Sequence, residues 1–265
     1  MVLTIFLFRC SLFYVIFHIF VYFLVYFVKQ QTQLEELSLR KLFFNSTVHR
    51  RNLKMQSKLA QALSHFLSTQ THLTRLDLSQ ISWSVDMGME VLTSVTSNAG
   101  SNPLTHLFLR DYFMNGLNAA NQQLLMQSLR MFTHLQELSI NYNCLSDDVI
   151  DLISKTCGAT LQHFDVWAYK FDAQLQTIDD FQWKLFHDRA PAVQSSWHLE
   201  SIQEFRSVQS VMQRHLPNVT SFEFWNCSQP LGEHIVVKDW LDGGVKRVVL
   251  MRNNAVVDDV SYRFR

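Results

Sequence analysis

The stretch "LSINYNCLSDDVIDLISKTCGATLQHFDV", Leu138–Val166, changes its apolar period twice within one short segment. Leu138 and Ile140 alternate with polar residues, as a strand with one buried face requires. Apolar residues at three- and four-residue spacing over 149–153 then predict an amphipathic helix. Phe164 and Val166 return to alternation, so the stretch predicts strand, helix and strand in succession.

The predicted helix has recognisable ends. Ser146 carries a hydroxyl that can cap free N–H groups, and Asp147 and Asp148 stand where the helix dipole favours negative charge. Gly158 follows the helix as a candidate C-cap. The two carboxylates would also suit a metal ion, but the electrostatics of a helix start explains them more simply.

The strand pattern L-x-x-L-x-L recurs along the chain, as one turn of a repeated unit predicts. The longest interval between successive copies, from Leu161 to Val219, is divided by a degenerate copy near Val193. The apolar positions of the seven copies are Leu34/Leu37/Leu39, Leu73/Leu76/Leu78, Leu104/Leu107/Leu109, Leu135/Leu138/Ile140, Leu161/Phe164/Val166, Val219/Phe222/Phe224 and Val245/Val248/Leu250.

Helical stripes separate the strand patterns. One comprises Leu59, Ala62, Leu63, Phe66 and Leu67, and the other comprises Leu124, Leu125, Leu129 and Phe132. A single strand–helix unit buries too little surface to be stable alone, so neighbouring units must stack. We therefore expect an α/β leucine-rich repeat solenoid over residues 31–265, with a curved parallel sheet, helices on its convex side and irregular repeats of about 26–39 residues.

The ninth repeat position supports this fold only in part. A leucine-rich repeat turns inward there, commonly with an Asn or Cys that hydrogen-bonds the turn backbone. Asn143, Cys227 and Asn253 occupy this position. Leu42, Ile81, Tyr112 and Tyr169 occupy it in other copies, which indicates an irregular solenoid.

The segment from Asn143 to Val166 resembles the cysteine-containing leucine-rich repeat, with Leu145-Ser146-Asp147, then Cys157, at the characteristic positions. This subtype is typical of F-box proteins, the substrate receptors of cullin-based (SCF-type) ubiquitin ligases. The resemblance implies a non-catalytic module that binds a protein substrate on its concave face. It is sharp within this segment and diffuse over the rest of 31–265.

The F-box itself, which would dock the ligase adaptor, is not recognisable. That three-helix module commonly opens with a Leu-Pro pair before the repeats, and the first proline of the chain is Pro103. We therefore expect an adaptor interaction only if an F-box is restored upstream. The alternative function is a membrane-anchored repeat scaffold or adaptor without a role in ubiquitylation.

Residues 1–30 form a hydrophobic segment with two interpretations. Ser11–Val28 contains no formally charged residue and is long enough for a membrane-spanning helix, and the basic residues that follow would leave the repeats in the cytosol. Alternatively, the start is misassigned, since seven of the 21 Phe lie in residues 1–28. A cleaved signal peptide fits poorly because no suitable cleavage site follows.

The four cysteines point to a reducing compartment. They are scattered at Cys10, Cys144, Cys157 and Cys227, without the paired caps of extracellular repeat domains. Sequons at Asn218 and Asn226 flank a predicted strand, where glycans would crowd the stack. We expect a cytoplasmic location, or a single-pass anchor with the repeats in the cytosol.

No pattern of catalysis or cofactor binding stands out. The 23 basic and 23 acidic residues leave a formal net charge of zero, so no global electrostatic attraction to nucleic acid is expected. No phosphate-binding loop or zinc spacing is present in the sequence. His163 and Asp165 share a strand face, yet no nucleophile lies in reach. We expect no enzyme activity, cofactor or metal.

The candidate site is the concave face, which the side chains between the strand leucines reach by period-two alternation. Aromatic and arginine side chains there are the usual anchors of protein interfaces. Large rings could instead be covered by irregular repeats. The candidate residues are His106, Phe108, Arg110, Asn141, His163, Asp165, Trp167, Glu223 and Trp225.

Overall fold

The computed structural model describes residues 2–4, 34–40, 53–96, 103–113, 117–168, 178–199, 219–225, 233–241, 245–252 and 255–263. It divides into two compact units, an N-terminal unit of residues 1–138 and a C-terminal unit of residues 139–265. The predicted division into 1–30 and 31–265 stays a prediction, because residues 5–33 lie outside the described part.

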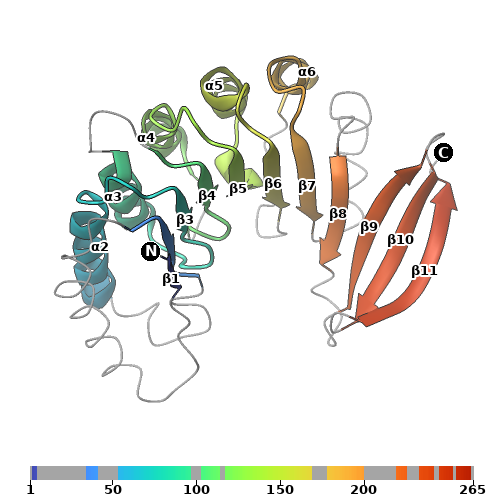
Figure 1. The fold of residues 1–265 in the computed structure, drawn as a ribbon, viewed down its shortest axis with the longest axis horizontal. Coiled ribbons are helices and arrows are strands. Elements are labelled where there is room, and N and C mark those ends of the chain that lie inside the picture. The colour runs from blue at the N-terminus through green and yellow to red at the C-terminus, as the bar shows by residue number, and fades with distance from the viewer. Residues whose placement is uncertain are drawn as a thin grey trace. The chain divides into compact units, whose positions relative to one another are not determined.

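The N-terminal unit is an α/β layer whose strands are all parallel. Its strands are β1 (Val2–Thr4), β2 (Glu36–Ser38), β3 (Arg75–Asp77) and β4 (His106–Phe108), and its helices are α2 (Leu53–Leu67), α3 (Val85–Thr96) and α4 (Ala119–Leu129). Figure 1 shows the three helices on one side of these strands. Strand β5 (Glu137–Asn141) begins in this unit and ends in the next.

The leucine pattern builds the core of this unit. Leu37, Leu76 and Leu107 lie in one register row across β2, β3 and β4 and expose 1% or less of their surface. Burial of each such side chain contributes about 1.5–3 kcal/mol. The predicted stripe on α2 is confirmed, since Leu59 and Leu63 are fully buried.

The stripe predicted on α4 is wrong at one position. Leu125 and Leu129 are buried, but Leu124 is 44% exposed. Leu124 and Leu125 are adjacent and therefore point about 100° apart on the helix, so a face that buries one turns the other toward solvent.

The same hydrogen-bond pattern recurs at successive strands of this unit. The carbonyl before a strand accepts two N–H groups of the next strand, one at 2.7–2.8 Å and one at 3.0 Å. The acceptor and its two donors are Glu35 with Thr74 and Arg75, Thr74 with Thr105 and His106, and Thr105 with Gln136 and Glu137. The recurrence from Thr74 to Thr105 follows the spacing of the leucine pattern in the sequence.

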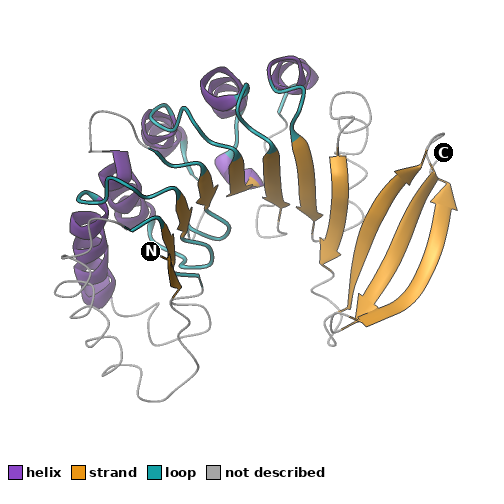
Figure 2. Cartoon of the chain, in the orientation of Figure 1, coloured by secondary structure: helices purple, strands orange, loops and turns teal. Residues whose placement is uncertain are grey.

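The C-terminal unit combines parallel and antiparallel strands. Its elements are a 3₁₀ turn (Tyr142–Cys144), α5 (Asp147–Cys157), β6 (His163–Ala168), α6 (Asp180–Arg189), β7 (Gln194–Leu199), β8 (Val219–Trp225), β9 (Glu233–Leu241), β10 (Val245–Arg252) and β11 (Ala255–Arg263). β6, β7 and β8 are parallel, whereas β8 to β11 pair antiparallel. The strand near Val193 is confirmed as β7, and Figure 2 shows helices beside the parallel strands.

The antiparallel end corrects the prediction of an entirely parallel sheet. Three residues separate β9 from β10, and two separate β10 from β11. Parallel neighbours need a crossover of a dozen or more residues, while antiparallel neighbours can be joined by a tight turn. The leucine-like pattern at Val245 thus forms a strand, but one of opposite direction to its neighbours.

The ends of α5 agree with the sequence. Ser146 Oγ accepts the Val149 N–H at 3.4 Å, and Asp147 and Asp148 occupy the first turn. Gly158 is the C-cap, but in right-handed rather than left-handed conformation. A side chain there would collide with the Ser154 carbonyl and lie 2.9 Å from the Arg189 carbonyl oxygen, so close backbone packing of α5 on α6 requires the glycine.

Cys157 and the predicted turn residues have different outcomes. Cys157 is buried, its thiol donates to the Ile153 carbonyl at 3.3 Å, and burial raises its pKa to about 12. Asn143 lies in the 3₁₀ turn, where its Oδ1 accepts from the Cys144 thiol at 3.4 Å instead of from the turn backbone. Cys227 and Asn253 lie outside the described residues.

The predicted membrane segment cannot be placed, since Ser11–Val28 lies outside the described residues. Among the helices that are described, none combines the length and the apolar character needed to cross a bilayer.

Candidate functional site

The sheet face opposite the helices of the N-terminal unit carries the side chains that alternate with the buried leucines. We call it the open face and define it by Glu36, Ser38, Arg75, Asp77, His106, Phe108, Arg110 and Glu137. Backbone register places Glu36, Arg75 and His106 in one row across β2, β3 and β4. Glu137, on β5, continues this row after His106. Its backbone N–H donates to the Thr105 carbonyl.

Arg75 lies at the centre of this face. Its guanidinium carbon lies 4.4 Å from the centroid of the Phe108 ring, and its Nη1 lies 3.7 Å from Glu137 Oε2. The side chain keeps 40% of its surface exposed. A guanidinium held over a ring remains planar and keeps its N–H donors at the rim, where they can meet a partner.

Glu137 lies beside the Arg75 guanidinium and the His106 imidazole. His106 Nε2 is 3.8 Å from Glu137 Oε2, close to the distance of the Arg75 contact. Both distances exceed a hydrogen bond, and Glu137 is 23% exposed. The carboxylate therefore lies near the positive charge of Arg75 without a direct hydrogen bond to Arg75 or His106, which leaves its oxygens available to other donors.

Two threonine hydroxyls form hydrogen bonds between neighbouring strands next to this row. Thr74 Oγ1 donates to the Glu35 carbonyl and Thr105 Oγ1 donates to the Thr74 carbonyl, each at 3.0 Å. Thr105 Oγ1 also lies 2.8 Å from His106 Nδ1. The second position of the repeat thus fixes both the strand pairing and the orientation of the imidazole.

The predicted candidates in this unit are partly exposed. His106 keeps 30% of its side chain exposed, and Phe108 is half-buried under Arg75. Arg110 is more covered, with 14% exposed, and pairs with Asp111 at 3.6 Å. Its carbonyl accepts the Gln80 N–H from the neighbouring turn. Arg110 therefore serves the turn more than the open face.

Left-handed residues shape the two turns beyond this face. Gln80 has φ 63° and Asp111 has φ 50°, and they occupy equivalent positions after β3 and β4. The next residues, Ile81 and Tyr112, are fully buried. Apolar side chains thus fill the inward position where Asn was expected.

The corresponding face of the C-terminal unit is covered at its centre. Trp167, a candidate anchor whose ring could also be covered, retains only 8% exposure, and its indole N–H donates to Ser139 Oγ at 3.0 Å. Asn141 is buried as well, with 8% exposed. The burial of Trp167 agrees with the alternative that irregular repeats cover the rings, because strand alternation says which face a side chain takes but not what covers that face.

The remaining candidates of the C-terminal unit are distributed unevenly. His163 is exposed and Asp165 is half-buried on β6. Glu223 and Trp225 lie on β8, whose side chains lie outside the described part. Only Trp167 and Asn141 of these candidates are therefore known to be buried.

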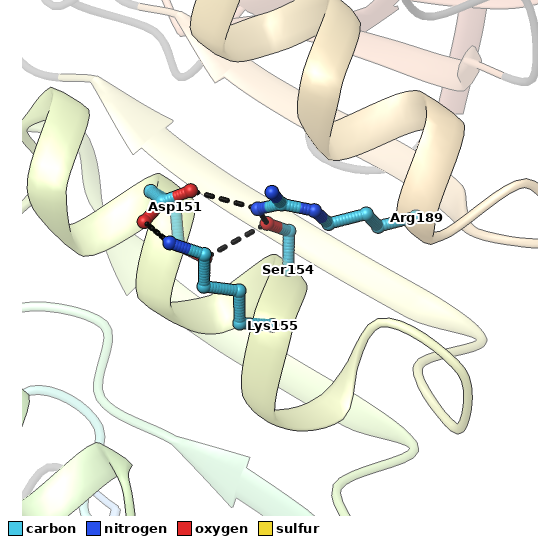
Figure 3. Close-up of polar contacts among 4 residues, drawn as sticks. All are labelled: Asp151, Ser154, Lys155 and Arg189. Carbon is cyan, nitrogen blue, oxygen red and sulfur yellow. Dashed lines mark hydrogen bonds and ion pairs between the residues drawn. The ribbon is translucent and has the colours of Figure 1, made fainter.

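The helices of the C-terminal unit hold a polar cluster instead. Arg189 Nη1 on α6 donates to Asp151 Oδ1 at 2.7 Å and to Ser154 Oγ at 3.1 Å, while Lys155 Nζ lies 2.5 Å from Asp151 Oδ2 (Figure 3). The Lys155 hydrogen bond is the main cause that lowers the pKa of Asp151, and Arg189 adds to it. This cluster joins α5 to α6.

Asp147 has a similar structural role. Its Oδ1 accepts the backbone N–H of Asp179 at 2.8 Å, and Asp179 in turn caps α6 through the Phe181 N–H.

Among the described residues, no group of three or more His, Cys, Asp or Glu side chains could hold a metal ion.

Sequence reasoning did not select Arg75 and Glu137 as site residues, although they occupy the same repeat position as His106 and His163. The signal that could have identified both residues is the alternation of acidic and basic side chains at this repeat position, from Glu36 through Arg75 and His106 to Glu137. No known protein-family model matches the chain.

Proposed function

We propose that the chain is a non-catalytic protein-recognition module that receives a protein partner on the open face. The observation that carries the proposal is the arrangement of Arg75, Phe108 and Glu137. Neither the Arg75 guanidinium nor the Glu137 carboxylate forms a hydrogen bond within the described residues, although both are held in place. Preorganised arginine and aromatic side chains lose little entropy on binding, which makes them effective interface anchors.

A leucine-rich repeat solenoid is the architecture we infer for this module. The shared spacing of leucines, left-handed residues and bifurcated carbonyls supports a repeated unit. Stacking of such units places equivalent side chains in rows, and rows that differ in chemistry recognise one partner rather than many.

The finer proposal is that this module is the substrate-binding part of an F-box protein in a cullin-based ubiquitin ligase. The resemblance of Asn143–Val166 to the cysteine-containing repeat supports it, and so does the burial of Cys157 in α5. Adaptor docking would then depend on an F-box encoded upstream, and the module would act in the cytosol.

Recognition is tested by quantitative affinity capture from cell extract with the full chain as bait. The face variant combines Arg75→Glu with Phe108→Ala, and the matched control is Lys58→Glu, an exposed change on α2 of the same unit. We expect proteins that the wild type and the control retain equally and the face variant loses at least tenfold. Equal capture by all three folded baits would contradict the open face as the binding site.

The ligase proposal needs a separate experiment. The chain is expressed with its natural upstream coding sequence, and the cullin adaptor is sought by co-purification. We expect the adaptor to accompany the extended chain but not residues 1–265 alone. Absence of the adaptor from the extended chain would reject the ligase role while leaving protein recognition intact.

A further inference from the structure

We propose that the partner presents a basic segment to the open face, with lysine or arginine side chains that pair with the carboxylates of this face. The inference rests on the proposed function and adds the chemistry of the partner to it. It follows from the acidic side chains that the strand registers bring together on one side of the sheet.

Carboxylates predominate among the charged side chains of the open face. Glu36, Asp77 and Glu137 come from three different strands, and each keeps part of its side chain exposed. Among them lies the Arg75 guanidinium, next to Glu36 in the strand register and 3.7 Å from Glu137 Oε2. The chain as a whole has 23 basic and 23 acidic residues, so the acidic excess is local to this face.

The second arginine of the open face does not remove this excess. Arg110 keeps only 14% of its side chain exposed, and its Nε lies 3.6 Å from Oδ2 of the adjacent Asp111, whose carboxylate offsets its charge. A partner therefore meets three carboxylates and the Arg75 guanidinium. The carboxylates remain in excess whether or not His106 is protonated.

The carboxylates retain acceptor capacity for a partner. Asp77 Oδ1 accepts the Ser79 backbone N–H at 2.9 Å, which orients the side chain and uses one of its two oxygens. The Glu137 oxygens accept no hydrogen bond within the described residues, because the Arg75 contact is too long to be one. An ionised carboxylate can accept about four hydrogen bonds, so both side chains can receive the N–H donors of a lysine or an arginine.

An anionic partner is disfavoured at the same place. A phosphate or carboxylate that approaches Arg75 also approaches Glu36 and Glu137, and like charges brought together across an interface are costly. A basic segment meets attraction from these carboxylates instead. The N–H donors of Arg75, held over the Phe108 ring, can then bond the neutral backbone carbonyls of that segment.

The strand order also sets a spacing for the cations of the partner. Asp77 on β3 and Glu137 on β5 are separated by two strand intervals and by two residues along the strand direction. With strands about 4.8 Å apart and a rise of about 3.3 Å per residue, their backbones lie about 12 Å apart. An extended segment covers this distance in about three or four residues, so we expect basic residues at that spacing.

The test selects binders from a display library of random linear peptides, with the full chain as bait at low salt. We expect lysine and arginine to be enriched over the unselected library, and aspartate and glutamate to be depleted. Fluorescence anisotropy then gives the affinities of the selected peptides. Glu137→Gln and Asp77→Asn should each weaken binding by about twofold to fivefold, because each removes one carboxylate from a partly exposed ion pair.

The variants and the control are matched in shape and charge. Asp77→Asn keeps an oxygen that can accept the Ser79 N–H, so the turn is preserved. Glu90→Gln removes an exposed carboxylate from α3, which lies on the helix side of the same unit (Figure 1), and should bind like the wild type. Equal weakening by Glu90→Gln would show that only the net charge of the chain matters and would overturn the proposal.

The remaining outcomes separate this inference from the proposed function. Selection of acidic or uncharged peptides that Phe108→Ala weakens, self-association of the chain through this face, or absence of any enriched peptide would overturn the basic partner and leave the open face as a recognition surface. Peptides that bind the wild type, Glu137→Gln and Phe108→Ala equally would overturn both, because their binding would not involve the open face.

Discussion

The two units place their polar side chains differently. The N-terminal unit carries Arg75, His106 and Glu137 on its sheet face, at contacts of 3.7–3.8 Å that leave all three partly exposed. The C-terminal unit places a polar cluster between its helices, where Arg189 and Asp151 meet at 2.7 Å. Short contacts between packed elements stabilise the fold, whereas loose and exposed ones leave side chains ready for another molecule.

The sheet faces differ in the same sense. Phe108 lies half-buried beneath a guanidinium, while Trp167 is buried and hydrogen-bonded to the buried Ser139. Two aromatic residues at related repeat positions thus have different environments. The comparison predicts that substitutions in the C-terminal unit reduce stability, while those in the N-terminal unit alter recognition.

The largest effect should follow from the two aromatic residues. Trp167→Ala should lower the free energy of unfolding by about 3–5 kcal/mol, because it removes a buried ring and leaves a cavity. Phe108→Ala should cost less, about 1–2 kcal/mol, since the ring is only half-buried. Urea unfolding followed by far-UV circular dichroism measures both, and equal costs would remove the distinction between the two faces.

The next effect concerns the serines on the two faces. Ser139→Ala deprives the Trp167 N–H of the Ser139 oxygen in a buried setting and should cost about 1–2 kcal/mol. Ser38→Ala, on half-exposed β2, should stay within about 0.5 kcal/mol. Thermal unfolding of the two variants provides the measurement, and a neutral Ser139→Ala would show that this hydrogen bond contributes little.

The cluster between α5 and α6 should produce a pH-dependent effect. The lowered pKa of Asp151 means that its stabilisation is present above the usual carboxyl value of about 3.9 and is lost as pH falls through the lowered value. Asp151→Asn should therefore cost about 1 kcal/mol at pH 7, with the difference from wild type shrinking below about pH 4. Unfolding curves between pH 3 and pH 7 test this.

A matched control for this prediction lies on the same helix. Asp148→Asn removes an exposed carboxylate from the first turn of α5, where the helix dipole accounts for only about 0.3–1 kcal/mol. If Asp148→Asn cost as much as Asp151→Asn at every pH, the contacts with Lys155 and Arg189 would not be the source of the effect.

The smallest effect on stability is expected for Glu137→Gln. Its two ion pairs are longer than hydrogen bonds and partly exposed, so the change should stay within about 0.5 kcal/mol. Chemical denaturation at low and moderate salt gives the measurement. A cost above that of Asp151→Asn would mean that the open face contributes to stability and is not reserved for a partner.

Several local features could be predicted from the sequence because they depend on neighbouring residues alone. The helix start at Ser146, the buried stripe of α2 and the strand at Val193 follow from capping chemistry and apolar period. Membership in the leucine-rich repeat class and the role in ubiquitylation stay predictions.

The tertiary structure decided which faces are covered and which residues meet. A strand pattern places Trp167 and Phe108 alike, yet only the packed chain buries the first and leaves the second beneath Arg75. Strand direction at β10 also depended on its short connections. Arg75 and Glu137 are distant in sequence. They meet because β3 and β5 lie on either side of β4.

The sequence by itself thus determined several secondary-structure elements, among them the helix that begins after Ser146 and the strand near Val193, because periodicity and capping act over a few residues. Only the tertiary structure decided that the fold can present a preorganised charged row, because exposure and side-chain contacts depend on what lies across the sheet. The surroundings of His106 illustrate this. Its Nδ1 lies 2.8 Å from the Thr105 hydroxyl oxygen, and that hydroxyl donates to the Thr74 carbonyl.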